Sequence, residues 1–178
     1  MKRLVLILIM FSFFSKGYAD YSKLAYDFKF NSIDGGQINL DNYREKVIVI
    51  VNVASRCGFT NQYEDLQDIW SNYKEKDLVV VGIPTNNFRQ EPGSNKEIKD
   101  FCETNFNINF PMSEKLDVIG NNAHPFYKWA KKNYGKAPIP NWNFHKIIIG
   151  KEGKVVTTFS SITRPSSKKF INTIEKLI

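Results

Sequence analysis

The chain has 178 residues, a formal net charge of +7 and a composition that is 42% hydrophobic, 24% charged and 14% aromatic. This length and composition suit one globular domain, and no low-complexity tract indicates a disordered protein. The lysines are scattered or stand beside acidic residues, without a basic stripe interleaved with aromatic residues. The composition therefore argues against a nucleic-acid-binding protein.

The first 19 residues have the layout of a secretory signal peptide. Lys2 and Arg3 precede an apolar run at 4–14, and Ala19 ends a short stretch with small residues. The run is shorter than the roughly 20 residues that span a bilayer, although a retained anchor or a short buried helix is the alternative. We expect a cleaved signal at 1–19, one mature domain at 20–178 with a net charge of about +4, and export to the periplasm or the extracellular space.

Hydrophobic periodicity and turn residues predict a chain of alternating strands and helices. The run at 47–53 is almost entirely β-branched, which is typical of a central strand buried on both faces of an α/β sheet. In chain order we expect strands at 28–30 and 37–40 around Asp34-Gly35-Gly36, a strand at 47–53, a helix capped by Thr60 or Asn61, a strand at 78–83, a helix with a capping box at Ser94 and Glu97, a helix from Pro125 to Gly135, strands at 142–149 and 155–159, and a helix opened by Pro165. This order predicts a mixed sheet with helices on both faces.

Cys57 is the strongest candidate for a chemically reactive residue. It follows a predicted buried strand and precedes a predicted helix, the junction at which α/β proteins usually place their sites. Unpaired N–H groups at a helix N-terminus stabilise a thiolate, and Arg56 adds positive charge. The alternative is an inert buried cysteine or one half of a structural disulfide with Cys102, the other cysteine of the chain.

The residues after Cys57 limit the reactions that its thiol can perform. The stretch Cys57–Thr60 (CGFT) has the frame of a dithiol motif but carries threonine in place of the second cysteine. Local dithiol–disulfide exchange is therefore impossible here. A single thiolate is suited instead to attack on a peroxide oxygen, which yields a sulfenic acid.

Three ordered blocks resemble the signatures of the glutathione peroxidase family, and the resemblance extends over roughly residues 25–177. The blocks are Asn52–Thr60 (NVASRCGFT), Ile83–Gly93 (IPTNNFRQEPG) and Trp142–Lys146 (WNFHK), with further matches at Phe110-Pro111 and His124-Pro125. The family implies a thioredoxin-like α/β fold and a hydroperoxide reductase that needs no cofactor.

The resemblance also implies a catalytic tetrad. It assigns the nucleophile to Cys57 and the assisting N–H donors to Trp142 and Asn143, because such donors stabilise a thiolate and the departing oxygen. Without the resemblance, we would interpret Trp142 as a core aromatic residue and Asn143 as a turn residue. The fourth member is normally a glutamine, and Asn87 stands at that position, one methylene shorter. We expect Asn87 to assist, either because its loop moves closer or through a bridging water, and Gln90 is the alternative.

Cys102 has two interpretations. Its spacing from Ile98 and Phe101 places it on the apolar face of a helix, where cysteine is often a small buried hydrophobe. The resemblance implies instead a resolving thiol, because thioredoxin-dependent members carry a Phe-Cys pair here. A sulfenic acid on Cys57 then condenses with Cys102, and an external dithiol reduces the disulfide.

The expected reaction converts a hydroperoxide and two thiols into an alcohol, water and a disulfide. The expected partners are a hydroperoxide and a thioredoxin-like dithiol or glutathione. The short connection from Lys115 to Trp142 resembles that of monomeric members that accept lipid hydroperoxides. The alternatives are a peroxide sensor without turnover, a binding module stapled by a disulfide, and a peroxiredoxin, against which the Trp142-Asn143 pair argues.

Overall fold

The computed structural model describes residues 23–178, so the expected signal peptide at 1–19 lies outside the described residues. A four-stranded sheet with strand order β4-β3-β5-β6 forms the centre, and the N-terminal hairpin is a separate two-stranded sheet. The strands are β1 (Lys29–Asn31), β2 (Gln37–Asn39), β3 (Val47–Val53), β4 (Leu78–Pro84), β5 (Lys146–Ile149) and β6 (Val155–Phe159). Strands β3 and β4 run parallel and the other neighbours antiparallel, so the sheet is mixed, as the sequence predicts.

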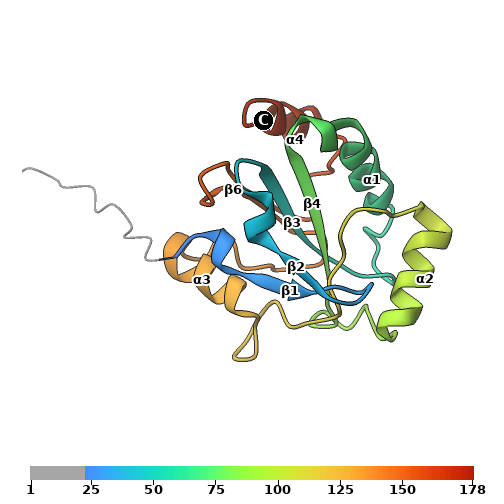
Figure 1. Ribbon diagram of the computed structural model, residues 1–178. Coiled ribbons are helices and arrows are strands. Elements are labelled where there is room, and N and C mark those ends of the chain that lie inside the picture. Colours follow the sequence, from blue (N-terminus) through green and yellow to red (C-terminus); the bar gives the residue numbers. More distant parts are fainter. Residues whose placement is uncertain (1–22) are drawn as a thin grey trace, which may run out of the picture.

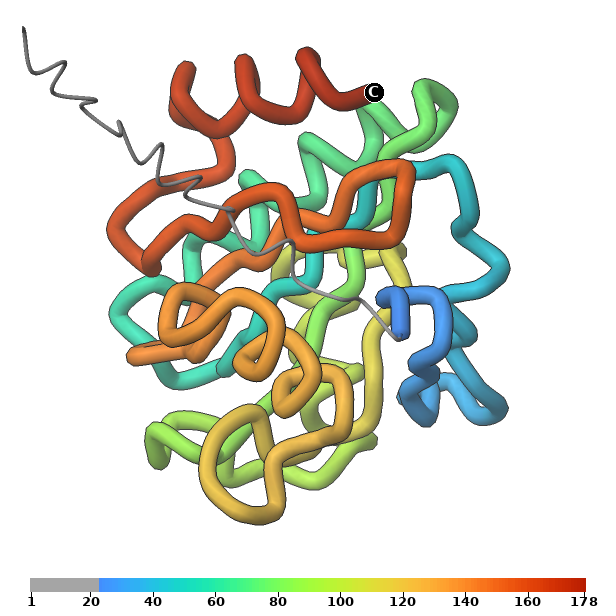
Figure 2. Tube along the Cα trace, turned by 90° about the vertical axis from the view of Figure 1, so that its left-hand side faces the viewer, coloured from blue at the N-terminus to red at the C-terminus, as the bar shows by residue number. Residues whose placement is uncertain are grey.

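Helices cover both faces of this sheet (Figure 1). Their bounds are α1 (Gln62–Tyr73), α2 (Asn95–Phe106), α3 (Pro125–Tyr134) and α4 (Lys168–Glu175), with short 3₁₀ turns at Ala25–Asp27, Leu40–Tyr43 and Lys74–Lys76. Helices α1, α2 and α4 share one apolar cluster, whereas α3 and the β1–β2 hairpin share the other. Figure 2 shows α4 along one end of the molecule, well away from α3.

The two clusters follow from the alternation of side chains along β3. Val47, Val49 and Val51 pack toward α1 and α4, whereas Ile48 and Ile50 pack toward α3. Every residue of β3 and of β4 is buried, which explains why both strands are recognisable as nearly unbroken apolar runs.

Local signals set the ends of two helices as expected. The Ser94 side chain accepts from the N–H of Glu97, and the Glu97 carboxylate accepts from the N–H of Ser94, which completes the capping box of α2. Pro125 is the first residue of α3, and Gly135 follows its end with φ +68°.

Two predicted boundaries were wrong. The predicted strand at 142–149 begins only at Lys146, because Phe144 adopts a left-handed conformation with φ +62° and turns the chain. The last helix begins at Lys168 rather than at Pro165, because the Ser167 side chain accepts from the N–H of Phe170 and caps it there. Within residues 23–178, no helix has both the length and the hydropathy that a membrane crossing requires.

His145 makes stability depend on pH. Its side chain is buried and its Nε2 has no hydrogen-bond partner among residues 23–178. Burial, with the nearby Lys146 charge, lowers the pKa of His145 from 6.5 to about 4. Because the folded value lies below the unfolded one, the stability present above pH 6.5 is lost as the pH falls through 4. We expect a loss of about 3 kcal/mol in that window, measured by urea unfolding.

The matched variant is His145→Gln, which removes the titration and keeps a polar side chain. Its unfolding free energy should fall less steeply between pH 6.5 and 4 than that of the wild type. Equal slopes for the two proteins would contradict this assignment.

Candidate active site

The carboxyl ends of β3 and β4 carry two loops that lie against each other. Val53 and Pro84 are neighbours in the parallel ladder, and the N–H of Thr85 donates to the carbonyl of Val53 at 3.1 Å. The loop after β3 carries Cys57, and the loop after β4 carries the second sequence block. The candidate site therefore lies at this edge of the sheet.

Cys57 is a free thiol in the turn between β3 and α1, and the residue is 8% exposed. Its Sγ accepts from the N–H of Phe59 at 3.4 Å, and its own N–H donates to Oγ1 of Thr60 at 3.0 Å. The Thr60 hydroxyl in turn lies 3.0 Å from the carbonyl of Ala54 and 2.7 Å from that of Cys57. Thr60 thus closes the turn, while the cap position belongs to Asn61, whose side chain makes no cap hydrogen bond.

The loop after β4 holds the residues just before Cys57. The Glu91 carboxylate is buried and accepts from the N–H of Ser55 at 2.7 Å and from its hydroxyl at 2.9 Å. The N–H of Arg56 donates to the carbonyl of Gln90 at 3.0 Å. Burial raises the pKa of Glu91, while the bonds from Ser55 and the charges of Lys115 and Arg56 act in the opposite direction.

Asn143 reaches the same loop from the third block. It is fully buried, and its amide nitrogen donates to Oε1 of Gln90 at 2.9 Å. An amide nitrogen carries two hydrogens, so one remains for another acceptor. Of the assisting residues named from the sequence, the structure joins Asn143 to Gln90, and joins Gln90 through its backbone to Arg56.

Asn52 holds this segment in place and was given no role by sequence reasoning. Its side-chain amide donates to the carbonyl of Trp142 at 3.1 Å, and its own carbonyl accepts from the N–H of Phe144. Its N–H donates to the carbonyl of His145 at 3.3 Å. The signal available in the sequence was a lone asparagine within the otherwise apolar run at 47–53, and the structure buries it fully.

Trp142 lies at the surface of this edge, with 42% of the residue exposed. Its ring contacts that of Phe88, with ring centroids 5.5 Å apart. Its indole N–H donates no hydrogen bond to any group of residues 23–178 and is free for a ligand. The two rings form a small apolar surface beside Asn143.

The side chain of Asn87 is directed toward the loop at 117–119. Its amide nitrogen donates to Asp117 at 2.7 Å, and its side-chain oxygen accepts from the N–H of Val118 at 2.7 Å and of Ile119 at 3.3 Å. The Thr85 hydroxyl also donates to that oxygen at 3.0 Å. The Asn87 amide is thus occupied by the loop at 117–119, and the alternative residue, Gln90, is the one that contacts Asn143.

Cys102 is also a free thiol, and it is buried on α2. Burial raises the pKa of Cys102 to about 11, with smaller contributions from Glu91 and Glu103, while the hydroxyl of Tyr63 acts against them. Burial also raises the pKa of Tyr63, as do the charges of both cysteines. Cys102 therefore lies near the buried hydroxyl of Tyr63 on α1, and it is a neutral thiol at physiological pH.

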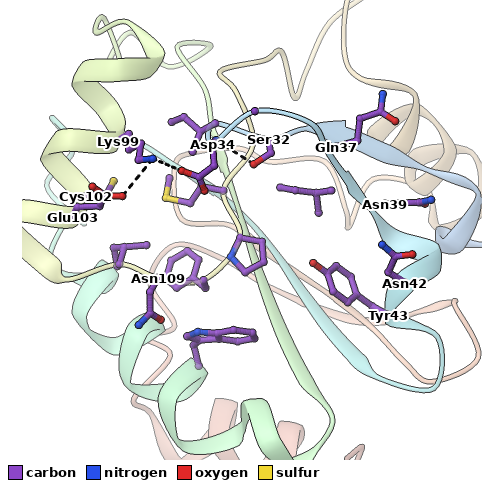
Figure 3. Close-up of a pocket in the computed structure, with 18 residues that line it drawn as sticks. Ser32, Asp34, Gln37, Asn39, Asn42, Tyr43, Lys99, Cys102, Glu103 and Asn109 are labelled. Atoms are coloured by element: carbon purple, nitrogen blue, oxygen red, sulfur yellow. Dashed lines mark hydrogen bonds and ion pairs between the residues drawn. The ribbon is translucent and has the colours of Figure 1, made fainter.

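A cavity of about 560 Å³ lies between α2 and the β1–β2 hairpin, and Cys102 is on its lining (Figure 3). Lys99 of α2 crosses to the hairpin and pairs with Asp34 at 2.5 Å. An ion pair therefore joins α2, the helix that carries Cys102, to the hairpin at the edge of this cavity. Among residues 23–178, no cluster of three histidine, cysteine or acidic side chains is arranged to hold a metal ion.

Solved structures place the fold among the thioredoxin-like proteins. A thiol:disulfide interchange protein of Chlorobium tepidum is 13% identical and superposes with a TM-score of 0.65 over 84% of this chain and 92% of its own. The crystal structure of Trgpx in its apo form is 32% identical, with a TM-score of 0.67 over 88% of this chain and 96% of its own.

The model of the glutathione peroxidase family matches residues 25–131. Glutathione peroxidase-like peroxiredoxin 2 of Saccharomyces cerevisiae is 42% identical over 80% of this chain and 90% of its own length. Hydroperoxy fatty acid reductase gpx1 of Synechocystis is 39% identical over 90% of this chain and 99% of its own. The chain belongs to the glutathione peroxidase family and is a hydroperoxide reductase of the glutathione peroxidase-like type.

The contacts of Asn87 predict a structural effect of its loss. Asn87→Ala leaves two backbone N–H groups and Asp117 without their partner, which should lower the unfolding free energy by about 1–3 kcal/mol. Chemical denaturation measures this value. Asn121→Ala is the control, because Asn121 is an exposed residue near the same loop. An Asn87 variant as stable as the control would contradict the anchoring role.

Proposed function

We propose that Cys57 is the peroxidatic cysteine and that Cys102 is the resolving cysteine of this hydroperoxide reductase. The observation that carries the proposal is the setting of the Cys57 sulfur. It is a free thiol with a peptide N–H directed at it, beside a loop that holds the amides of Gln90 and Asn143. Such donors stabilise negative charge on sulfur and on the departing oxygen.

The first step forms a sulfenic acid. The Cys57 thiolate attacks the terminal oxygen of the hydroperoxide, the O–O bond breaks, and the departing alkoxide takes a proton and leaves as the alcohol or as water. Trp142, Asn143 and Gln90 supply N–H donors at this edge. Gln90 takes the fourth place of the tetrad rather than Asn87, because it is the glutamine that contacts Asn143.

The second step forms the disulfide. The Cys102 sulfur attacks the sulfenic sulfur, water leaves, and a Cys57–Cys102 disulfide results. An external dithiol or two glutathione molecules then reduce it through a mixed disulfide. Because Cys102 is buried in α2, the helix must open locally in each cycle before the two sulfurs bond.

The proposed substrates include bulky hydroperoxides. A relative named a hydroperoxy fatty acid reductase supports this class, as does the apolar surface of Phe88 and Trp142 beside the site. The proposed reductant is a thioredoxin-like protein or glutathione, and we propose that the protein acts as a monomer.

The sequence at 1–19 supports export, with residues 20–178 forming the single mature domain in the periplasm or outside the cell. A reductant must then be present in that compartment. N-terminal sequencing of the secreted or periplasmic protein tests the cleavage site after Ala19.

Substitution of the two cysteines separates their roles. Cys57→Ser should abolish hydroperoxide consumption, because hydroxyl oxygen does not form the sulfenic acid. Cys102→Ser should form one sulfenic acid per chain and then stop when thioredoxin is the reductant. Mass spectrometry and NADPH-coupled turnover with thioredoxin reductase measure these outcomes.

Full thioredoxin-dependent turnover by Cys102→Ser would remove its resolving role. Turnover by Cys57→Ser would refute the proposed nucleophile. A wild-type protein that is oxidised once and never turns over with either reductant would be a sensor instead.

The assignment of the fourth tetrad place predicts a kinetic difference between two neighbours. Gln90→Met should lower the second-order rate constant for oxidation of Cys57 by roughly 100-fold, the usual effect of losing one donor to a developing negative charge. Asn87→Ala should change this constant by less than about threefold at a temperature where it is folded. Stopped-flow fluorescence measures both, and the reverse order would return the role to Asn87.

A further inference from the structure

Lys146, the first residue of β5, is fully buried. An ammonium group is costly to remove from water, and lysine is seldom fully buried unless it is paired. The Asp65 carboxylate attracts it, but the amine forms no ion pair among residues 23–178. Burial lowers the pKa of Lys146 to about 7, with Asp65 raising it and Arg164 lowering it further.

The amine instead makes two directed hydrogen bonds. It donates to Oε1 of Gln62 and to the carbonyl of Thr163, the second at 2.8 Å. Gln62 is the first residue of α1 and is also buried, and its own amide nitrogen donates to the carbonyl of Ser161 at 2.6 Å. Both ends of the Gln62 amide are therefore fixed.

Gln62 connects this amine to the reacting sulfur. The backbone N–H of Gln62 donates to the carbonyl of Phe59 at 2.9 Å, and the N–H of Phe59 donates to Sγ of Cys57 at 3.4 Å. Three hydrogen bonds, joined by the covalent frames of Gln62 and Phe59, thus connect the Lys146 amine to the thiol. Because saturated carbons separate the side-chain amide of Gln62 from its backbone N–H, the connection acts by fixing the positions of these groups.

We propose that Lys146 is a positioning residue for Cys57: through Gln62 it fixes Phe59, whose backbone N–H stabilises the thiolate. The inference rests on the proposed function, because it takes Cys57 as the reacting thiol. Lys146 lies three residues after Asn143, so the segment 143–146 contacts both flanks of the Cys57 turn. Asn143 acts through Gln90 on the residue before Cys57, and Lys146 acts on the residues after it.

The loop at 160–167 and helix α1 have a second connection, which does not involve Gln62. Arg164 donates to both carboxylate oxygens of Asp65 on α1, at 2.8 and 2.9 Å. This pair ties the loop at 160–167 to the first turn of α1, as the contacts of Lys146 do. Arg164→Met is therefore a matched control for a merely structural effect.

The test compares Lys146→Met, Gln62→Leu, the double variant and Arg164→Met in the mature chain, each in the Cys102→Ser background so that only one thiol reacts. Two quantities are measured: the second-order rate constant for oxidation of Cys57 by hydrogen peroxide, and the rate of alkylation of Cys57 by iodoacetamide from pH 4 to 10. The pH profile follows the charge on sulfur, and the charged or titratable groups that face the amine are Asp65, Arg164 and His145.

We expect Lys146→Met and Gln62→Leu each to lower the oxidation rate constant about tenfold and to move the alkylation profile to higher pH. The double variant should be no slower than either single variant, because both act through one chain of contacts. Arg164→Met should stay within about twofold of the parent. If Lys146→Met does not fold, the oxidation rate constant and the alkylation profile of Gln62→Leu decide whether the inference holds.

An unchanged alkylation profile in the Lys146 and Gln62 variants would overturn the inference, as would an equal effect of Arg164→Met. Such a result leaves the loss of activity in Cys57→Ser intact. Failure of the proposed function would appear separately, as turnover by Cys57→Ser itself.

Discussion

The parallel pairing of β3 with β4 is the constraint on which the site depends. With Val53 opposite Pro84, both chains leave the sheet at the same edge, and their loops meet there. Glu91 and Gln90 then receive the backbone N–H groups of the two residues before Cys57. Any slip of this register would separate Cys57, the proposed nucleophile, from the loop that carries Gln90 and Glu91.

Polar side chains in the interior carry most of the connections around Cys57. Asn52, Glu91 and Asn143 are all buried, and each makes at least one hydrogen bond to another segment of the site. Two side-chain amide oxygens, those of Asn52 and Asn143, are buried without a partner among residues 23–178. Such arrangements cost stability and specify one geometry, which is why they concentrate where chemistry requires a fixed arrangement.

The sequence predicted the parts of the fold that local patterns determine. Strands β3 and β6 match the predicted ranges because apolar or β-branched runs and flanking turns define them. The strand start at Lys146 could not be predicted, because the turn at Phe144 depends on contacts with Asn52, 92 positions earlier in the chain. For the same reason the sequence favoured Asn87 over Gln90 for the fourth place, since Asp117 and Asn143, their partners in the structure, are distant in sequence.

The burial of Cys102 has a consequence for how the protein fails. In the proposed cycle, a sulfenic acid on Cys57 waits for α2 to open, and a second hydroperoxide molecule can oxidise it meanwhile to a sulfinic acid, which thiols do not reverse. The free energy of local opening of α2 then sets the oxidant concentration at which inactivation outruns turnover. The Lys99–Asp34 contact raises that free energy, whereas the cavity beside Cys102 removes packing that would otherwise hold the helix closed.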